Sequence, residues 1–343
     1  MQTKQAIEKI SRGTTEIISV EGLEKKLKKA SKEGCALRVK AGFDPTAPDI
    51  HLGHVVLLRK LRQFQDLGHK VLFLIGDFTA LVGDPTGRNE LRPNLDLSFI
   101  RENAKTYAKQ AFKILDSDPD KVEIVYNYDW LDKIGAQKLL ELTAHSTVAQ
   151  MLARADFKKR YESGSQISIM EFVYPLLQGY DSVHLEADVE LGGNDQKFNL
   201  LMGRQLQETF SQEPQVVVMT PLLEGLDGVK KMSKSLDNYI GIDESPSEIL
   251  GKIMSISDEL MMRYCEVLTD FDLSEVKNMH PKDAKLQLGR EIVKQFYDDE
   301  KARQAQVEFE KVFSQGQVPD EMPGYQLDSR EKETVLDVLV NSG

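Results

Sequence analysis

The chain has 343 residues and a formal net charge of −11 at pH 7, because 55 aspartates and glutamates outnumber 44 lysines and arginines. This acidic balance argues against nucleic-acid binding by a surface that is basic throughout, while 41% hydrophobic residues are ordinary for a compact globular protein. No apolar run reaches the length of a membrane-spanning helix, and the first residues lack the apolar core of a signal peptide, so we expect a cytoplasmic protein with no membrane partner.

Strand-like and helical segments alternate over the first two thirds of the chain. After an N-terminal helical segment at 1–34, apolar runs rich in β-forming residues are separated by helical spacings such as those at 57–64 and 104–115. The expected strands span residues 36–43, 70–75, 122–126, 187–191 and 215–219. Because such alternation is typical of βαβ units, we predict the α/β class, with a Rossmann-like parallel sheet in a domain at 35–220.

The chain changes character at residues 245–248, which read Ser-Pro-Ser-Glu: an N-cap serine, a proline at the first helical position and a capping glutamate. Beyond this point the apolar residues keep helical spacing without a convincing strand. We therefore predict a smaller α-helical domain over 245–325, joined to the sheet by a linker at 221–244. The two cysteines, Cys35 and Cys265, stand far apart without a metal-binding pattern, so we expect buried, reduced thiols and no metal site.

The segment from Gly42 to His54 runs from a predicted strand into a helix. A helix N-terminus offers unpaired N–H groups and a positive dipole end, and Gly53 lets a ligand approach the backbone. His51 and His54, three positions apart, can both donate to phosphate oxygens, so this segment predicts a phosphate site. Two alternatives stay open: histidines that only cap the helix, and a zinc pair, which would need a third protein ligand.

The segment 230–235 reads Lys-Lys-Met-Ser-Lys-Ser and follows the turn pair Asp-Gly, which indicates an exposed loop. Three lysines on such a loop could be no more than a solvated charge run. The literal string argues for more, because chance gives a stated five-residue string in about one in ten thousand chains of this length. We expect Lys231 and Lys234 to close over an anion during a reaction.

Two segments carry polar residues that are unusual for a core. Tyr174, Gln178 and Asp181 share one face of a predicted helix, where the alternative is a polar stripe on the surface. At 191–196 a strand ends in glycines before a capping-type Asn or Asp. Since open α/β sheets bind ligands at the carboxyl ends of their strands, Asp195 could take two ribose hydroxyls there while glycine admits a nucleoside.

Together, His-x-Gly-His early in an α/β domain and Lys-Met-Ser-Lys-Ser at its end resemble the paired signatures of class I aminoacyl-tRNA synthetases. In that family both motifs converge on ATP and stabilise the departing pyrophosphate. The resemblance implies catalytic roles for His51, His54, Lys231 and Lys234, and for Thr46 at a position that contacts the outer phosphate. It implies an ATP site made of Asp44, Gly53, Gly193, Asp195 and Lys234. ATP is then a substrate used with Mg²⁺, and no prosthetic group is implied.

The segments 174–181 and 191–196 are further similar to those of bacterial tyrosyl-tRNA synthetases. The resemblance implies that Asp181 binds the phenolic hydroxyl of tyrosine, while Tyr174 and Gln178 bind its α-amino group. The implied tyrosine site also includes Asp84, Thr79, Asn127 and Gln196. The implied activity has two steps: tyrosine and ATP give tyrosyl-adenylate and pyrophosphate, and tRNA(Tyr) then accepts the tyrosine. A tryptophanyl-type class I enzyme and a catalytically idle RNA-binding paralogue stay open as alternatives.

Three positions depart from this pattern. Many bacterial tyrosyl enzymes place a tyrosine, which shares the substrate hydroxyl with the aspartate, two residues before the glycine of Gly-Phe-Asp-Pro-Thr-Ala. This chain has Lys40 at that position. It also has Lys197-Phe198 where tryptophan-glycine is common, and Arg88 where lysine is often found. These departures indicate a second bacterial subgroup.

The resemblance covers roughly residues 10–325 and implies a homodimer, with a connective insertion at about 122–166 as the dimer surface. A basic cluster at the end of this insertion is expected to meet acceptor-stem phosphates of tRNA; it consists of Arg154, Lys158, Lys159 and Arg160. Bacterial members continue into an S4-like RNA-binding domain. We therefore expect residues 326–343 to be the start of such a domain in a truncated chain.

Overall fold

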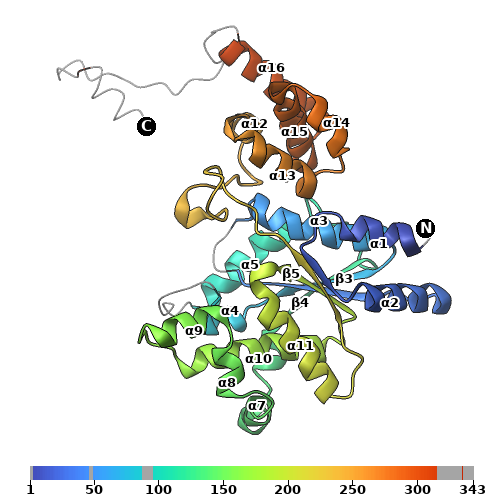
Figure 1. The fold of residues 1–343 in the computed structure, drawn as a ribbon, viewed down its shortest axis with the longest axis vertical. Coiled ribbons are helices and arrows are strands. Elements are labelled where there is room, and N and C mark those ends of the chain that lie inside the picture. The colour runs from blue at the N-terminus through green and yellow to red at the C-terminus, as the bar shows by residue number, and fades with distance from the viewer. Residues whose placement is uncertain (1–2, 46–48, 87–95, 315–333, 335–343) are drawn as a thin grey trace.

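The computed structural model describes residues 3–45, 49–86, 96–314 and 334. A six-stranded sheet at its centre has the order β1-β6-β5-β2-β3-β4 (Figure 1). The strands are β1 (Glu16–Ile18), β2 (Arg38–Phe43), β3 (Lys70–Ile75), β4 (Val122–Tyr126), β5 (Val189–Gly193) and β6 (Val216–Thr220). Every neighbouring pair is parallel except β1 with β6. The predicted α/β class with a parallel sheet is therefore confirmed.

The predicted strands agree with the structure to within two residues, and β3 and β4 have the predicted bounds. The strand β1 was missed, because the segment 1–34 was expected to be helical throughout. This strand has three residues and pairs only at the sheet edge, where Ile17 lies opposite Val218. Three residues are too few to reveal the alternation of side chains that identifies a strand.

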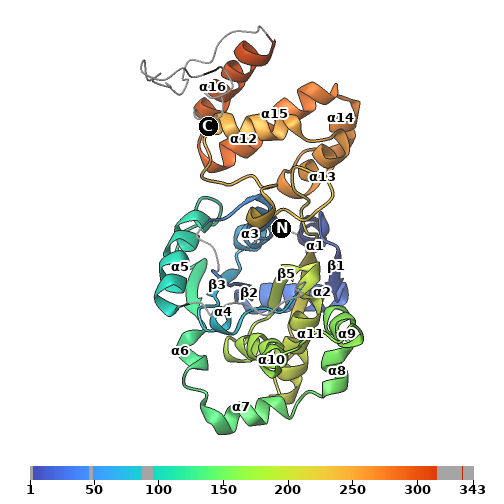
Figure 2. The same cartoon turned by 90° about the vertical axis from the view of Figure 1, so that its left-hand side faces the viewer.

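Helices cover both faces of the sheet (Figure 2). They are α1 (Thr3–Ser11), α2 (Val20–Glu33), α3 (Leu52–Asp66), α4 (Thr79–Val82), α5 (Leu97–Ala111), α10 (Ile169–His184) and α11 (Lys197–Thr209). The strand β3 shows the two faces: Val71 and Phe73 belong to the core with α3 and α5, whereas Leu72 and Leu74 face Leu185 beyond α10. A strand buried on both faces reads as an unbroken apolar run, which is why the sequence revealed it.

Four short helices fill the insertion between β4 and α10: α6 (Tyr128–Leu131), α7 (Gly135–Thr143), α8 (Val148–Leu152) and α9 (Ala155–Glu162). They share a small core with α10 and α11, in which Met151 and Phe157 pack with Leu176 of α10. The insertion was placed at about 122–166. Because residues 122–126 are β4 and pair with β3, it starts after that strand.

After a loop at 221–245 the described chain is helical, with α12 (Pro246–Ser255), α13 (Asp258–Leu268), α14 (Leu273–Asn278), α15 (Pro281–Phe296), α16 (Asp299–Phe309) and a π turn at Glu310–Ser314. As predicted, Ser245 and Glu248 form the capping box of α12. These helices lie at one end of the molecule (Figures 1 and 2). Their core is continuous with that of α3. Residues 315–333 and 335–343, with the predicted start of a further domain, lie outside the described residues.

The two cysteines differ in their exposure. Cys265 is buried in α13, as expected, but Cys35 is exposed. Cys35 follows Gly34, which ends α2 in the left-handed conformation and turns the chain at the surface. In the part of the chain that the structure describes, no helix combines the length and the apolar character needed to cross a bilayer.

Candidate active site

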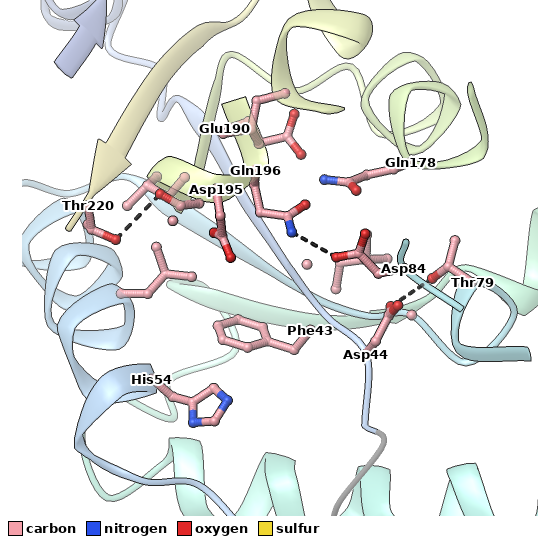
Figure 3. A pocket seen from close by; sticks show the side chains of 18 of the residues that line it. Phe43, Asp44, His54, Thr79, Asp84, Gln178, Glu190, Asp195, Gln196 and Thr220 are labelled. Carbon is pink, nitrogen blue, oxygen red and sulfur yellow. Dashed lines mark hydrogen bonds between the residues drawn. The ribbon is translucent and has the colours of Figure 1, made fainter. Parts of the chain in front are cut away.

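A cavity of about 310 Å³ opens at the carboxyl ends of the parallel strands. The order of the strands reverses between β2 and β5, and the crevice at such a reversal is where open α/β sheets bind ligands. Asp44, Gly193 and Thr220 line the cavity from the ends of β2, β5 and β6. Figure 3 shows Gln178 at one end of the cavity and His54 at the other.

Three polar side chains of α10 face this cavity: Tyr174, Gln178 and Asp181. This excludes the alternative of a surface stripe. Asp181 is 1% exposed, and its carboxylate accepts hydrogen bonds from Asn127 Nδ2 at 3.1 Å and from Trp130 Nε1 at 2.9 Å. Burial raises the pKa of Asp181 to about 7, although both donors stabilise the charged form. The cavity therefore holds a carboxyl group whose ionisation falls near neutral pH.

A chain of hydrogen bonds connects Tyr174 with Asp181, the first and last of these three side chains of α10. The Tyr174 hydroxyl donates to Asp44 Oδ2 at 2.8 Å, and the Thr79 hydroxyl donates to Asp44 Oδ1 at 2.8 Å. Asn127 Nδ2, which also donates to Asp181, donates to Thr79 Oγ1 at 3.0 Å. A side chain at Gly76 would destroy this arrangement, since a Cβ there would lie 2.0 Å from Asp44 Oδ1. Asp44, expected among the ATP residues, is thus bonded to two residues expected in the tyrosine site.

Asp84 and Gln178 present acceptor oxygens to the cavity. Gln196 Nε2 donates to Asp84 Oδ2 at 2.8 Å (Figure 3). Asn199 Nδ2 donates to Gln196 Oε1 at 2.9 Å. Within the described residues, the buried Oε1 of Gln178 has no hydrogen-bond partner. A buried polar atom without a partner costs free energy, so this oxygen favours a ligand that brings a donor, such as an ammonium group.

A second cleft of about 430 Å³ adjoins the first. The two share Gly53, His54, Tyr107 and Leu222 as lining residues. The second cleft is otherwise lined by Asp49, His51, Leu223 and the loop residues Lys231, Met232, Ser233, Lys234 and Ser235. The histidine motif and the lysine motif, about 180 residues apart in the sequence, thus meet at one cleft, as predicted.

The two histidines cap α3, and this capping fixes which ring nitrogen carries the proton. His51 Nδ1 accepts from the backbone N–H of Gly53 at 3.1 Å, and His54 Nδ1 accepts from the backbone N–H of His51 at 3.3 Å. Burial lowers the pKa of His51 to about 2 and that of His54 to about 4. Both rings are therefore neutral at pH 7 with the proton on Nε2, where it can be donated to an anion.

The two lysines of the loop are paired with carboxylates. Lys231 Nζ lies 3.8 Å from Asp195 Oδ2, and Lys234 Nζ is hydrogen-bonded to Asp49. Burial raises the pKa of Asp195, which the charge of Lys231 opposes. The loop backbone is held in place where Asn238 Oδ1 accepts from Ser233 N at 2.8 Å. The lysines thus sit at the cleft without being buried in it, with anionic partners that a phosphate could replace.

Thr46 lies outside the described residues, so its expected contact with phosphate has no structural account. Gly193 and Asp195 lie at the end of β5, as expected, and line the first cavity. Gly53 sits under the ring of His51, and a Cβ there would come within 2.9 Å of that ring. A side chain at Gly53 would therefore displace the ring that closes one side of the cleft.

Sequence reasoning gave no role to three residues of the site: the partly buried Trp130 and the fully buried Lys40 and Glu190. Trp130 bonds Asp181, and Lys40 Nζ lies 2.8 Å from Glu190 Oε1 at the inner end of the first cavity. The exposed fraction is 0% for Lys40 and 1% for Glu190. A charged residue in the middle of a strand that is buried on both faces is unusual, and that was the available signal for both.

The predicted basic cluster on the insertion is only half correct. Arg154 is buried, with Nε and Nη2 of its guanidinium group on the Asp156 carboxylate, and Arg160 is buried in an ion pair with Glu171. Their charges are used inside the protein, because a buried guanidinium requires a carboxylate partner. Of the four residues only Lys158 and Lys159 are exposed.

The fold and the two clefts are those of a class I tRNA synthetase. The family model described as "tRNA synthetases class I (W and Y)" matches residues 32–314. The tyrosine–tRNA ligase of Desulfotalea psychrophila is 55% identical over 333 residues, which cover 94% of this chain and 82% of that protein. That of Legionella pneumophila strain Paris is 57% identical over 321 residues, which cover 91% and 79%. The chain belongs to the tyrosine–tRNA ligase family within class I.

Solved structures share the fold. A C-terminally truncated mitochondrial tyrosyl-tRNA synthetase from Aspergillus nidulans matches with a TM-score of 0.75 and 23% identity, over 91% of this chain and 94% of that one. The tyrosyl-tRNA synthetase of Archaeoglobus fulgidus, complexed with L-tyrosine, matches with a TM-score of 0.70 and 23% identity, over 89% and 99%. At this identity the likeness concerns the fold alone.

Proposed function

We propose that this chain acts as a tyrosine–tRNA ligase: it activates L-tyrosine with ATP to tyrosyl-adenylate and pyrophosphate, and then transfers the tyrosine to tRNA(Tyr). The observation that carries the proposal is Asp181, a buried carboxylate at the inner end of a cavity whose outer end adjoins the His51–Lys234 cleft. A carboxylate that already receives two N–H donors retains lone pairs for one more donor, which the phenol of tyrosine supplies.

Tyrosine would lie along the face of α10 that carries Tyr174, Gln178 and Asp181. Its phenol donates to Asp181, and its ammonium group meets the acceptors at the other end, namely Asp84, the Tyr174 hydroxyl oxygen and the free Oε1 of Gln178. Thr79, Asn127 and Gln196 hold these groups in place through the hydrogen bonds described above. Phenylalanine would leave Asp181 without its donor, and tyrosyl-tRNA synthetases are the established example of rejection by this means.

The chemical step needs little acid–base help, because the substrate carboxylate is itself the nucleophile toward the α-phosphorus of ATP. Charge then develops on phosphorus and on the departing pyrophosphate, so the protein must position the reactants and neutralise that charge. In this proposal Asp195 and Gly193 hold the ribose side of ATP. The Nε2–H groups of His51 and His54 and the ammonium groups of Lys231 and Lys234 face the phosphates, and Asp44, Gly53 and Thr46 complete the ATP site. ATP enters as its magnesium complex, and Mg²⁺ shares the phosphate charge.

ATP–pyrophosphate exchange tests this proposal directly. Exchange that depends on tyrosine, and is far weaker with tryptophan or phenylalanine, is the expected result. Exchange that is fastest with tryptophan would favour a tryptophanyl enzyme, since an indole N–H can also donate to a carboxylate. No exchange with any of the three would favour an idle paralogue that binds RNA.

We further propose that the chain is a homodimer that pairs through its insertion. Large hydrophobic side chains are exposed on the insertion, Leu140 by 69%, Val148 by 63% and Tyr161 by 67%, and Ile169, the first residue of α10, is exposed by 82%. An apolar patch of this kind marks an interaction surface, and a second copy of the chain is the occupant that a symmetric assembly implies. Sedimentation of Ile169→Lys should show monomers, whereas Val307→Lys, at an exposed position on α16, should leave the assembly unchanged.

For tRNA we propose two contact regions. Lys158 and Lys159 face the acceptor stem, and the helices between residues 246 and 314 face the anticodon end, where Arg290 and Lys294 of α15 line a surface hollow. Replacing both Lys158 and Lys159 by glutamate should weaken tRNA charging and spare pyrophosphate exchange. The matched control replaces Lys28 and Lys32, which are exposed on α2. Equal loss in both reactions would refute the role in tRNA binding.

A further inference from the structure

Lys40 and Glu190 form an ion pair that is closed off from solvent beneath the tyrosine cavity. Lys40 lies on β2 and Glu190 on the neighbouring strand β5, with 2.8 Å between Nζ and Oε1. Taking two charges out of water is expensive, and an apolar pair of similar volume is often at least as stable. The pair is therefore not explained by stability alone.

The ammonium of Lys40 also binds one turn of α10. It donates to the Gln178 backbone carbonyl at 3.3 Å and to Ser182 Oγ at 2.8 Å. These two residues stand on either side of Asp181 in the helix, so Lys40 ties the turn that carries Asp181 to the sheet. Glu190 is held as firmly, since its Oε2 accepts from Ser182 Oγ at 3.0 Å and from Gln215.

We propose that Lys40 is a positioning and specificity-determining residue of the tyrosine site: its ammonium group fixes the turn of α10 that carries Asp181, and its positive charge favours the ionised form of Asp181, which accepts the phenol O–H. This inference rests on the proposed function. Asn127 and Trp130 donate hydrogen bonds to Asp181, and the charges of Lys40 and Glu190 also act on its pKa. Among them Lys40 contributes most to lowering the pKa of Asp181 against the effect of burial, whereas Glu190 contributes least and in the opposite direction.

Selectivity follows from the charge. An ionised carboxylate that loses its donor is costly to bury, so the cavity rejects phenylalanine strongly. A protonated Asp181 would lose less when phenylalanine binds, and it would accept the phenol of tyrosine less well. Removing the charge of Lys40 should therefore weaken tyrosine binding and reduce discrimination at the same time, and raising the pH should restore both.

The test is the pH profile of the tyrosine KM, measured by ATP–pyrophosphate exchange from pH 6 to 9 on wild type, K40M and the double variant K40M/E190Q. In wild type the KM should fall as pH rises through about 7, where Asp181 ionises. In both variants this midpoint should move up by about one pH unit or more, as expected for loss of a nearby opposite charge. The tyrosine-to-phenylalanine ratio of kcat/KM at pH 7 should fall by about tenfold, because one pH unit corresponds to that factor.

The double variant guards against a folding artefact, since it leaves neither charge unpaired. K26M is the matched control: Lys26 is also a buried lysine, 3.1 Å from Asp188, but neither of its carboxylate partners, Asp188 and Glu213, lines the cavity, whereas Glu190 does. Its midpoint and selectivity should equal those of wild type. Midpoints that stay unmoved in both Lys40 variants, with wild type active on tyrosine, would overturn the role of Lys40. A wild type that shows no exchange with tyrosine would instead overturn the proposed function.

Discussion

The two halves of the proposed active site, the tyrosine cavity of about 310 Å³ and the adjoining cleft of about 430 Å³ proposed to bind ATP, are built in opposite ways. Around the tyrosine cavity the polar groups are buried and bonded to one another, as in the chain from Tyr174 through Asp44 and Thr79 to Asn127. In the ATP cleft the cations stand on a loop, and each lies beside a carboxylate, Lys234 at Asp49 and Lys231 at Asp195. A preformed wall suits the recognition of one side chain, whereas a loop that can exchange partners suits a charge that appears only during the reaction.

The largest effect that this contrast predicts is on the loop side. Lys234→Ala should lower kcat of pyrophosphate exchange by roughly 10²–10³-fold, the usual loss when one preorganised donor to developing charge is removed. The dissociation constant of tyrosine, measured by equilibrium dialysis, should not change, because the tyrosine cavity does not use this lysine. Lys230→Ala, next to the cleft-lining residues but not among them, is the control and should retain wild-type kcat. A weaker binding of tyrosine in Lys234→Ala would show that the two halves are not independent.

On the cavity side, Asp181→Asn should lower kcat/KM for tyrosine by roughly 10–100-fold, because a hydrogen bond to a buried charged group is lost. The loss should appear in the tyrosine KM, and the KM for ATP should stay near the wild-type value. The same variant should lose little with phenylalanine, so steady-state exchange with both amino acids measures the selectivity directly. An equal loss with both amino acids would mean that Asp181 supports the fold of the cavity and does not read the phenol.

The two halves also differ in how far the sequence revealed them. The histidine and lysine motifs could be read directly, because strand-to-helix turns and loops have local signatures and motif residues stand close together in the chain. Tyr174, Gln178 and Asp181 were found because helical spacing places them on one face. The sheet itself followed from unbroken apolar runs such as β3 and β4.

What escaped prediction depends on contacts between distant segments. Nothing local shows that Trp130 reaches Asp181 or that Lys40 meets Glu190, which lies 150 positions further on. The basic cluster failed for the same reason: Arg160 looks like a surface residue in sequence, but Glu171 on the next helix draws it into the protein. Spacing within one element is readable, whereas ion pairing across elements follows only from the folded chain.

A smaller effect separates the two roles of His51. His51→Ala should lower kcat by about tenfold through loss of the Nε2–H donor and should also destabilise the protein by about 1 kcal/mol through loss of the cap of α3. His51→Asn should show the loss of kcat with most of the stability retained, because asparagine caps helices well. Urea denaturation and exchange kinetics measure the two effects, and equal stability of both variants would refute the capping role.

The lowered pKa of both histidines gives that comparison a pH dependence. Because their folded pKa values, about 2 and about 4, lie below the unfolded value of 6.5, the unfolded chain takes up protons first as the pH falls. Their contribution to stability should therefore decline below about pH 6.5. From pH 7 to pH 4.5 wild type should lose stability relative to His51→Asn, so that the variant becomes the more stable protein, and kcat should show no requirement for a protonated histidine. A wild type that gains stability relative to His51→Asn on acidification would contradict neutral rings.

The smallest expected effect tests whether the carboxylates hold the lysines back. Asp49 is about half exposed, so its pair with Lys234 is worth at most about 1 kcal/mol, and Asp49→Asn should lower the KM for ATP by no more than about fivefold. The direction is downward because Lys234 no longer has to leave a carboxylate before it meets a phosphate. In the Lys234→Ala background the same change should have no effect, since the partner is gone. If Asp49→Asn raises the KM in both backgrounds, Asp49 contacts the nucleotide complex itself, and the ATP cleft is then as preformed as the tyrosine cavity.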